Sequence, residues 1–122
     1  MTPLPAIVSL TRAGAVVAFE LELAADLPVF SGHFPGTPIL PAVAQIDWAL
    51  RLAREHFDLP RHFRGLRSLK FLRIVQPPGR VALELVHDGG AVSFAFSQSG
   101  AACSTGRIEF TDDAAGPDRS FL

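Results

Sequence analysis

Apolar and polar residues alternate along several short segments of this chain, which is the pattern expected of β-strands with one buried face. Between residues 15 and 23, for example, large apolar side chains alternate with two glutamates. Glycine-containing turns separate several of these segments, and the Asp-Gly-Gly run at residues 88–90 is a hairpin signal. The alternation predicts six strands, over residues 5–11, 15–23, 66–75, 80–87, 91–98 and 102–110.

One segment follows the helical period instead. Residues 30–41 contain five glycines and prolines, too many for a helix or a central strand, and predict a loop. The breakers stop after Pro41, and a proline suits the first turn of a helix because the amide it lacks would be unpaired there. We therefore predict a helix from Ala42 to Phe57. Its apolar stripe comprises Val43, Ile46, Leu50, Ala53 and Phe57. Most of the remaining circumference is also apolar, so we expect a buried helix.

The order of these elements predicts the fold class. Two strands come first, then a long loop, one buried helix and a meander of three or four strands. This order favours an α+β fold in which an antiparallel sheet wraps around one long central helix. We expect a single domain over residues 1–110 and a flexible polar tail over residues 111–122. The edges of such a sheet would stay open in a monomer, and edge-to-edge pairing in a dimer would cover one of them.

Composition favours an oligomer in a reducing compartment. The 122 residues are 48% apolar with a mean hydropathy of +0.29, more than so short a chain hides in its own core. No apolar run approaches the roughly 20 residues of a membrane span, and no signal-peptide pattern opens the chain. Cys103 is the only cysteine, so no intrachain disulfide forms and an inert core thiol is expected. We expect a cytoplasmic protein.

Positive charge is concentrated in one segment. Residues 51–80 hold eight of the eleven arginines and lysines but only two of the twelve acidic residues, although the net charge of the chain is −1. Such a patch could attract an acidic partner, or it could be a solvated face that binds nothing. The sequence pI of about 6.4 and the lack of a nucleic-acid-binding motif argue against DNA or RNA.

The residue spacing does not support a metal site or a phosphate loop. His56, His62 and His87 lack the spacing of metal ligands, and no cysteine cluster accompanies them, so we expect no metal. Gly32 and Gly36 are not followed by the Gly-Lys-Ser/Thr run of a phosphate-binding loop.

The loop and the helix together resemble a known family. The run His-Phe-Pro-Gly-Thr-Pro-Ile-Leu-Pro at residues 33–41, followed by a helix that carries Asp47, resembles the signature of 3-hydroxyacyl-[acyl-carrier-protein] dehydratases. The 14-residue interval from His33 to Asp47 matches the family's histidine-to-carboxylate spacing. Residues 69–79 are similar to the family's lysine–phenylalanine strand and its proline–glycine turn. Residues 38–49 look most like the small dehydratases of aryl-polyene-type gene clusters.

The resemblance implies the hotdog fold and an enzyme that needs no cofactor. The implied reaction is dehydration of 3-hydroxyacyl-[acyl-carrier-protein] thioesters to trans-2-enoyl thioesters, in fatty-acid or polyene biosynthesis. The implied partner is an acyl carrier protein bearing a phosphopantetheine-linked acyl chain. A homodimer, a higher oligomer of dimers, or a heterodimer with another hotdog subunit would complete the assembly.

The resemblance also implies roles for individual residues. His33 would be the base at the α-carbon, and Asp47, kept protonated by burial, the acid at the β-hydroxyl. The backbone amide of Ala42 would bind the thioester carbonyl. Phe30 and Phe34 would wall the acyl channel. In the family the histidine and the acid of one site come from different subunits, which implies two composite sites per dimer. Because acyl carrier proteins are acidic, the docking candidates are Arg61, Arg64, Arg67, Lys70 and Arg73.

Several alternatives stay open. The family usually has glycine at residue 42 and often glutamine at residue 51, where this chain has Ala42 and Arg51. His33 could be a loop histidine bonded to backbone, and Asp47 could pair with Arg51 one turn later. The chain could also be a hotdog acyl thioesterase, or a non-catalytic acyl-binding subunit of a hotdog heterodimer.

Overall fold

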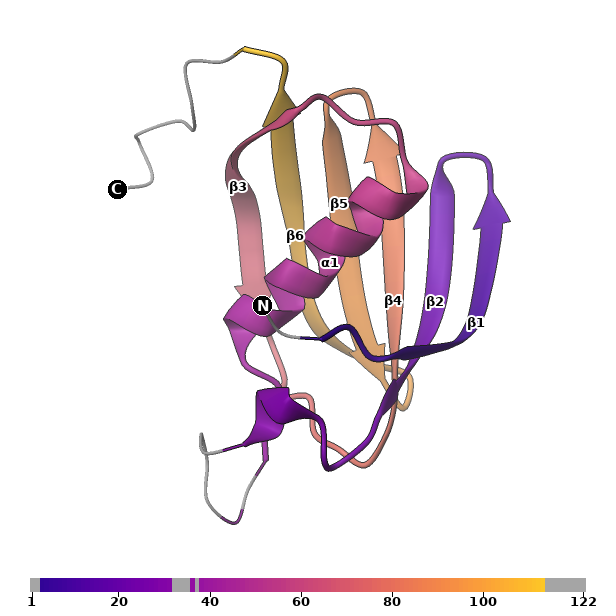
Figure 1. Cartoon of the computed structure of the whole chain (residues 1–122), viewed down its shortest axis with the longest axis vertical. Coiled ribbons are helices and arrows are strands. Elements are labelled where there is room, and N and C mark those ends of the chain that lie inside the picture. The colour runs from indigo at the N-terminus through magenta and orange to yellow at the C-terminus, as the bar shows by residue number, and fades with distance from the viewer. Residues whose placement is uncertain (1–2, 32–35, 37, 114–122) are drawn as a thin grey trace.

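The computed structural model describes residues 3–31, 36 and 38–113, which form a six-stranded antiparallel sheet with a long helix across one face (Figure 1). The predicted α+β class is therefore confirmed. The elements in chain order are β1 (Ala6–Ala13), β2 (Val16–Leu23), the 3-10 turn η1 (Pro28–Phe30), α1 (Ala42–His56), β3 (His62–Phe71), β4 (Gly79–Asp88), β5 (Ala91–Gln98) and β6 (Ala101–Thr111).

The strands do not follow one another across the sheet in chain order. Their order is β1-β2-β4-β5-β6-β3, so β3 lies at the edge beyond β6 while β2 pairs with β4. The connection through α1 carries the chain from β2 to the opposite edge (Figure 1). Of the three or four strands predicted for the meander, β4, β5 and β6 form it in order, and β3 lies outside it. Alternation of side chains locates a strand but does not specify which neighbour it pairs with.

The largest boundary error also concerns β3, which begins and ends four residues before the strand predicted at residues 66–75. Its pairing with β6 shifts at two places, and Ser68, at one of them, has a φ of 53° in the left-handed region. Beyond the strand, the amides of Leu72 and Arg73 both donate to the carbonyl of Cys103, at 2.8 and 3.2 Å. These irregularities break the regular alternation, which is why the sequence pattern misplaces the strand.

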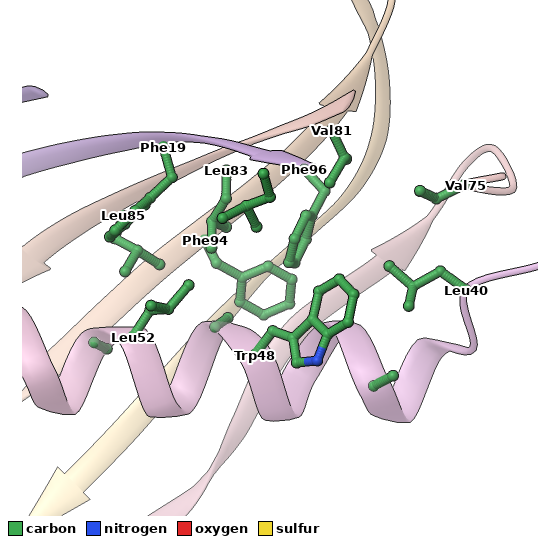
Figure 2. Close-up of a cluster of buried hydrophobic side chains, with 14 of the residues drawn as sticks. Phe19, Leu40, Trp48, Leu52, Val75, Val81, Leu83, Leu85, Phe94 and Phe96 are labelled. Atoms are coloured by element: carbon green, nitrogen blue, oxygen red, sulfur yellow. The ribbon is translucent and has the colours of Figure 1, made fainter. Parts of the chain in front are cut away.

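The core lies between the sheet and the inner face of α1. Trp48 is 0% exposed and stands between the phenylalanines of β5 on one side and Leu40 on the other (Figure 2). The buried residues of α1 are Ala44, Gln45, Trp48, Ala49, Leu52 and Ala53.

The apolar stripe predicted for α1 is largely on the wrong face. Val43 is 75% exposed, and Ile46 and Leu50 are only partly buried, whereas Ala53 and Phe57 are buried as predicted. Because α1 is apolar nearly all round, its pattern alone cannot distinguish the side that meets the sheet. One apolar face of the helix consequently points away from the sheet and stays uncovered in the single chain.

Both edge strands expose large apolar side chains as well. On and after β3 these are Phe63, Leu69, Phe71, Leu72 and Ile74, and on β1 they are Ile7, Val8 and Leu10. Exposed apolar edges of this kind are typical of surfaces that contact another subunit.

Gly106 of β6 has no room for a side chain. A Cβ placed there would lie 2.6 Å from both Leu69 Cδ2 and Phe94 Cε2, and Phe94 is only 2% exposed. We expect Gly106→Ala to lower the free energy of unfolding by about 1–3 kcal/mol, because the buried ring must shift. Thermal denaturation measures this loss. The neighbouring Thr105→Ala is the control and should change stability by less than about 0.5 kcal/mol. Equal stability losses in the two variants would contradict the steric argument.

Candidate active site

The first turn of α1 begins with backbone amides that the helical ladder does not use. Pro41 is the N-cap, with extended backbone (φ −63°, ψ 152°), and among the described residues no side chain caps this end of the helix. The earliest helical hydrogen bonds run from the amides of Ala44 and Gln45 to the carbonyl of Pro41, both at 3.1 Å. The amides of Ala42 and Val43 therefore precede the helical ladder, and the helix dipole favours negative charge next to them. The amide of Ala42 is the one that the sequence analysis predicts to bind the carbonyl.

A pocket of about 260 Å³ lies beside this first turn. Ala42 and Gln45 form one wall, and the chain at the end of β3 and just after it forms the other. The lining residues from that segment are Phe71, Leu72, Arg73 and Ile74. The pocket thus brings together the predicted carbonyl-binding amide and one of the predicted docking arginines, within a mostly apolar surface.

Asp47 lies one and a half turns into α1, on the side away from the buried face. Its Oδ2 accepts a hydrogen bond from Arg51 Nη1 at 3.3 Å, and the side chains are 36% and 25% exposed, respectively. The prediction that this carboxyl group is buried is wrong for the single chain, because α1 turns residues 47 and 51 outward. The alternative partner for Asp47, an arginine one turn later, is present.

The other residues proposed to meet the substrate are placed only in part. His33 and Phe34 lie outside the described residues. Phe30 ends η1 and is 7% exposed, as part of the same buried cluster as Trp48. The structure therefore places Phe30 in the core near the loop.

The five predicted docking residues are all exposed in the single chain. They lie on β3 and on the segments that flank it, at the sheet edge beyond β6. Arg67 pairs with Glu109 of β6, with its Nε 2.8 Å from Oε1. The other four docking candidates, which are also exposed, are Arg61, Arg64, Lys70 and Arg73. A positive surface therefore borders the pocket, with Arg73 belonging to both.

The sequence analysis missed a buried polar pair next to this pocket. Gln45 and Ser104 are 3% and 0% exposed, and Ser104 Oγ donates to Gln45 Oε1 at 2.6 Å. A glutamine within an otherwise apolar helix face was the available signal, since buried polar side chains need partners.

Among the described residues, no group of three or more histidine, cysteine or acidic side chains is placed to hold a metal ion. In the same part of the chain, no helix has the length and apolar character that crossing a bilayer demands.

The geometry can be compared with known proteins. The model of the ApeI-like family, described as ApeI dehydratase, matches residues 9–107, which include α1 and the loop before it. The chain belongs to the ApeI-like family. The resemblance to hotdog dehydratases is thereby confirmed, together with the hotdog fold.

Two solved structures are similar along most of their length. The dehydratase heterocomplex ApeI:P from Xenorhabdus doucetiae has 29% sequence identity and a TM-score of 0.79, covering 86% of this chain and 96% of that one. An uncharacterized protein from Erwinia carotovora subsp. atroseptica has 26% identity and a TM-score of 0.74, covering 88% and 95%. Both support the fold assignment for nearly the whole of this ApeI-like chain.

Curated relatives match a shorter stretch. The 3-hydroxyacyl-[acyl-carrier-protein] dehydratase FabZ of Chloroflexus aggregans is 34% identical over 73 residues, which are 54% of this chain and 51% of that protein. This ApeI-like chain spans about half the length of the curated relatives it matches.

Proposed function

We propose that this protein dehydrates 3-hydroxyacyl-[acyl-carrier-protein] thioesters to trans-2-enoyl thioesters, in fatty-acid or polyene biosynthesis. The observation that carries the proposal is the ApeI dehydratase match across residues 9–107, which spans the loop with His33 and the helix with Asp47. The dehydratase names of the relatives and the free amide of Ala42 beside a pocket support it. Such a substrate implies the cytoplasmic location expected from the sequence.

The reaction assigns one task to each group. His33 removes a proton from the α-carbon, and the electron pair left behind forms the α,β double bond. The β-carbon–oxygen bond breaks, and Asp47 donates a proton to the departing hydroxyl, which leaves as water. The amide of Ala42 binds the thioester oxygen while negative charge develops on it. No cofactor takes part, because the elimination involves no change in oxidation state that an external reagent must balance.

We propose a composite site in a dimer, or in an oligomer of dimers. Asp47 lies on the outward side of α1 with exposed Val43 and partly buried Leu50, and a second subunit over this face would shield its carboxyl group from water. Phe71, Leu72 and Ile74, exposed at the end of β3 and just after it, line the pocket beside the first turn of α1 and add to this apolar surface. The partner is either a second copy or a different hotdog subunit, and the structure from Xenorhabdus doucetiae is a heterocomplex.

A panel of acyl-carrier-protein substrates tests the function. Purified protein should convert 3-hydroxyacyl thioesters into trans-2-enoyl thioesters, detected by mass spectrometry of the carrier protein. Release of free carrier thiol without an enoyl product would instead identify a thioesterase. A panel of alkyl and aryl chains of increasing length would also define the substrate range.

We expect the positive surface around β3 to bind the acidic carrier protein. Lys70→Glu and Arg64→Glu should raise KM for carrier-linked substrates about tenfold, because each reverses a charge that steers the encounter. The same variants should change KM for a small thioester analogue less than about twofold. Arg80→Glu is the control, since Arg80 is an exposed arginine on β4 whose side chain forms a surface ion pair with Glu22. Equal effects on both substrates would argue against docking.

A non-catalytic subunit is the second candidate, and one observation favours it. Arg51 forms an ion pair with Asp47, so the carboxyl group already has a partner within the chain and must leave it to meet a substrate. If the purified chain alone yields no product, adding a second hotdog subunit should restore turnover. Loss of that turnover in Asp47→Asn would show that this chain supplies the acid.

A further inference from the structure

Two polar side chains are buried in the core of the described residues, and they contact each other. Ser104 of β6 is 0% exposed and its hydroxyl donates to Oε1 of Gln45, at 2.6 Å. Nε2 of Gln45 donates in turn to the carbonyl oxygen of Leu40, at 3.1 Å. The orientation of the glutamine amide is fixed by both ends, because the hydroxyl needs an acceptor and the carbonyl needs a donor. The result is a continuous link from the sheet to the chain just before α1.

Leu40 is held on both sides of its backbone. While its carbonyl accepts from Gln45, its amide donates to the carbonyl of Val75 at 2.8 Å. Figure 2 shows Leu40 and Val75 facing each other at the start of the helix, next to Trp48. Pro41 follows with φ fixed near −63°. The direction in which the Ala42 amide points is therefore set by the position of Leu40.

We propose that Gln45, oriented by Ser104, is a positioning residue that fixes the Ala42 amide toward the thioester carbonyl. The inference rests on the proposed dehydration. Gln45 also forms part of the pocket wall beside Ala42, so its side chain connects the sheet, the pocket and the helix start. A hydrogen-bond donor aimed at a developing oxyanion loses much of its effect when it moves by a fraction of an ångström. A buried link of this kind therefore affects the rate of the chemical step more than the affinity for substrate.

The test compares Gln45 with a buried residue of the same helix that lies far from its start. Gln45→Met keeps the shape of the side chain but removes both hydrogen bonds, and should lower kcat about 10- to 100-fold while KM changes less than about threefold. Leu52→Met is the matched control. Leu52 is 0% exposed and lies two turns further along α1, so its replacement disturbs the core without touching the link. Leu52→Met should lower the melting temperature slightly and leave kcat within about twofold.

Ser104 supplies a second variant pair in case Gln45→Met folds poorly. Ser104→Ala should lower kcat about 3- to 10-fold, and Ser104→Thr, which keeps the hydroxyl, should recover most of that loss. If kcat falls only in proportion to melting temperature across all four variants, the link is merely structural and the proposal is wrong.

A measurement without turnover separates this proposal from the proposed function. The backbone amide resonances of Ala42 and Val43, in ¹H–¹⁵N spectra of the whole protein, should shift in Gln45→Met and Ser104→Ala but not in Leu52→Met. Unchanged resonances in the first two variants would overturn the positioning role even if the enzyme is active. If the resonances shift but the protein dehydrates no substrate, the positioning role of Gln45 is supported and the proposed dehydration is wrong.

Discussion

His33→Ala and Asp47→Asn are each expected to lower kcat for dehydration by about 10²–10⁴-fold, the range in which a positioned acid or base contributes. Without His33 no group takes the α-proton, and without the Asp47 carboxyl group the hydroxyl leaves unprotonated. Single-turnover measurements with a carrier-linked substrate check both variants. The double variant should be little slower than either single one, because the two residues act as a unit.

Two control variants remove an aspartate and a histidine that lie outside the proposed site. Asp58 follows α1 and is exposed, and His62 begins β3 and is partly exposed. Asp58→Asn and His62→Ala should leave kcat within about twofold, as expected of surface changes. If His33→Ala or Asp47→Asn turns over as fast as these controls, the assignment of the site is wrong.

Mixing the two inactive variants tests whether the site is composite. In a homodimer with one histidine and one acid from different subunits, a mixed dimer contains one fully intact site and one doubly defective site. Random re-association of equal amounts should then restore about a quarter of wild-type activity, since half of the dimers are mixed and half of their sites are intact. No recovery after verified exchange of subunits would place both residues of a site in one chain.

The reliability of the sequence-based predictions followed the regularity of the local pattern. Strand β5 has the predicted bounds, because apolar and small residues alternate without a break between two turns. Helix α1 begins at the predicted residue, Ala42, because Pro41 marks its start, and it ends one residue before the predicted Phe57. In β3 the bulge at Ser68 shifts the alternation, and the strand was misplaced. Pairing across the sheet depends on the whole chain and had no local signal.

The positions of Ala42 and Asp47 could be predicted from the sequence, but the environment of Asp47 could not. The loop-and-helix motif placed both residues correctly on α1, yet the apolar stripe suggested a buried carboxyl group. An apolar residue such as Val43 gives the same pattern whether it faces the sheet or points outward, so the pattern alone could not show which face of the helix is buried. Gln45 was missed because a polar residue in a buried face weakens the apolar pattern. Its partner, Ser104, is 59 residues away, so no local pattern links the two.

Trp48→Ala is expected to have the largest effect on stability. Trp48 is 0% exposed at the centre of the core, where Figure 2 shows Phe94, Phe96 and Leu40 around its ring. Removing the ring costs about 3–5 kcal/mol, from lost burial and the cavity left behind. Total stability is about 5–15 kcal/mol, so thermal and urea denaturation should show a large loss or an unfolded chain. Glu55→Ala, at an exposed site on the same helix, should change stability by less than about 0.5 kcal/mol.

Trp48→Phe distinguishes the contribution of the aromatic ring from that of the indole N–H group. Within the described residues, Trp48 Nε1 is buried and has no hydrogen-bond partner. A buried unpaired donor costs roughly 1–3 kcal/mol. Phenylalanine removes that donor while keeping an aromatic ring, and the smaller ring leaves only a limited void. We therefore expect Trp48→Phe to retain most of the stability that Trp48→Ala loses. Equal destabilisation of the two variants would contradict this expectation.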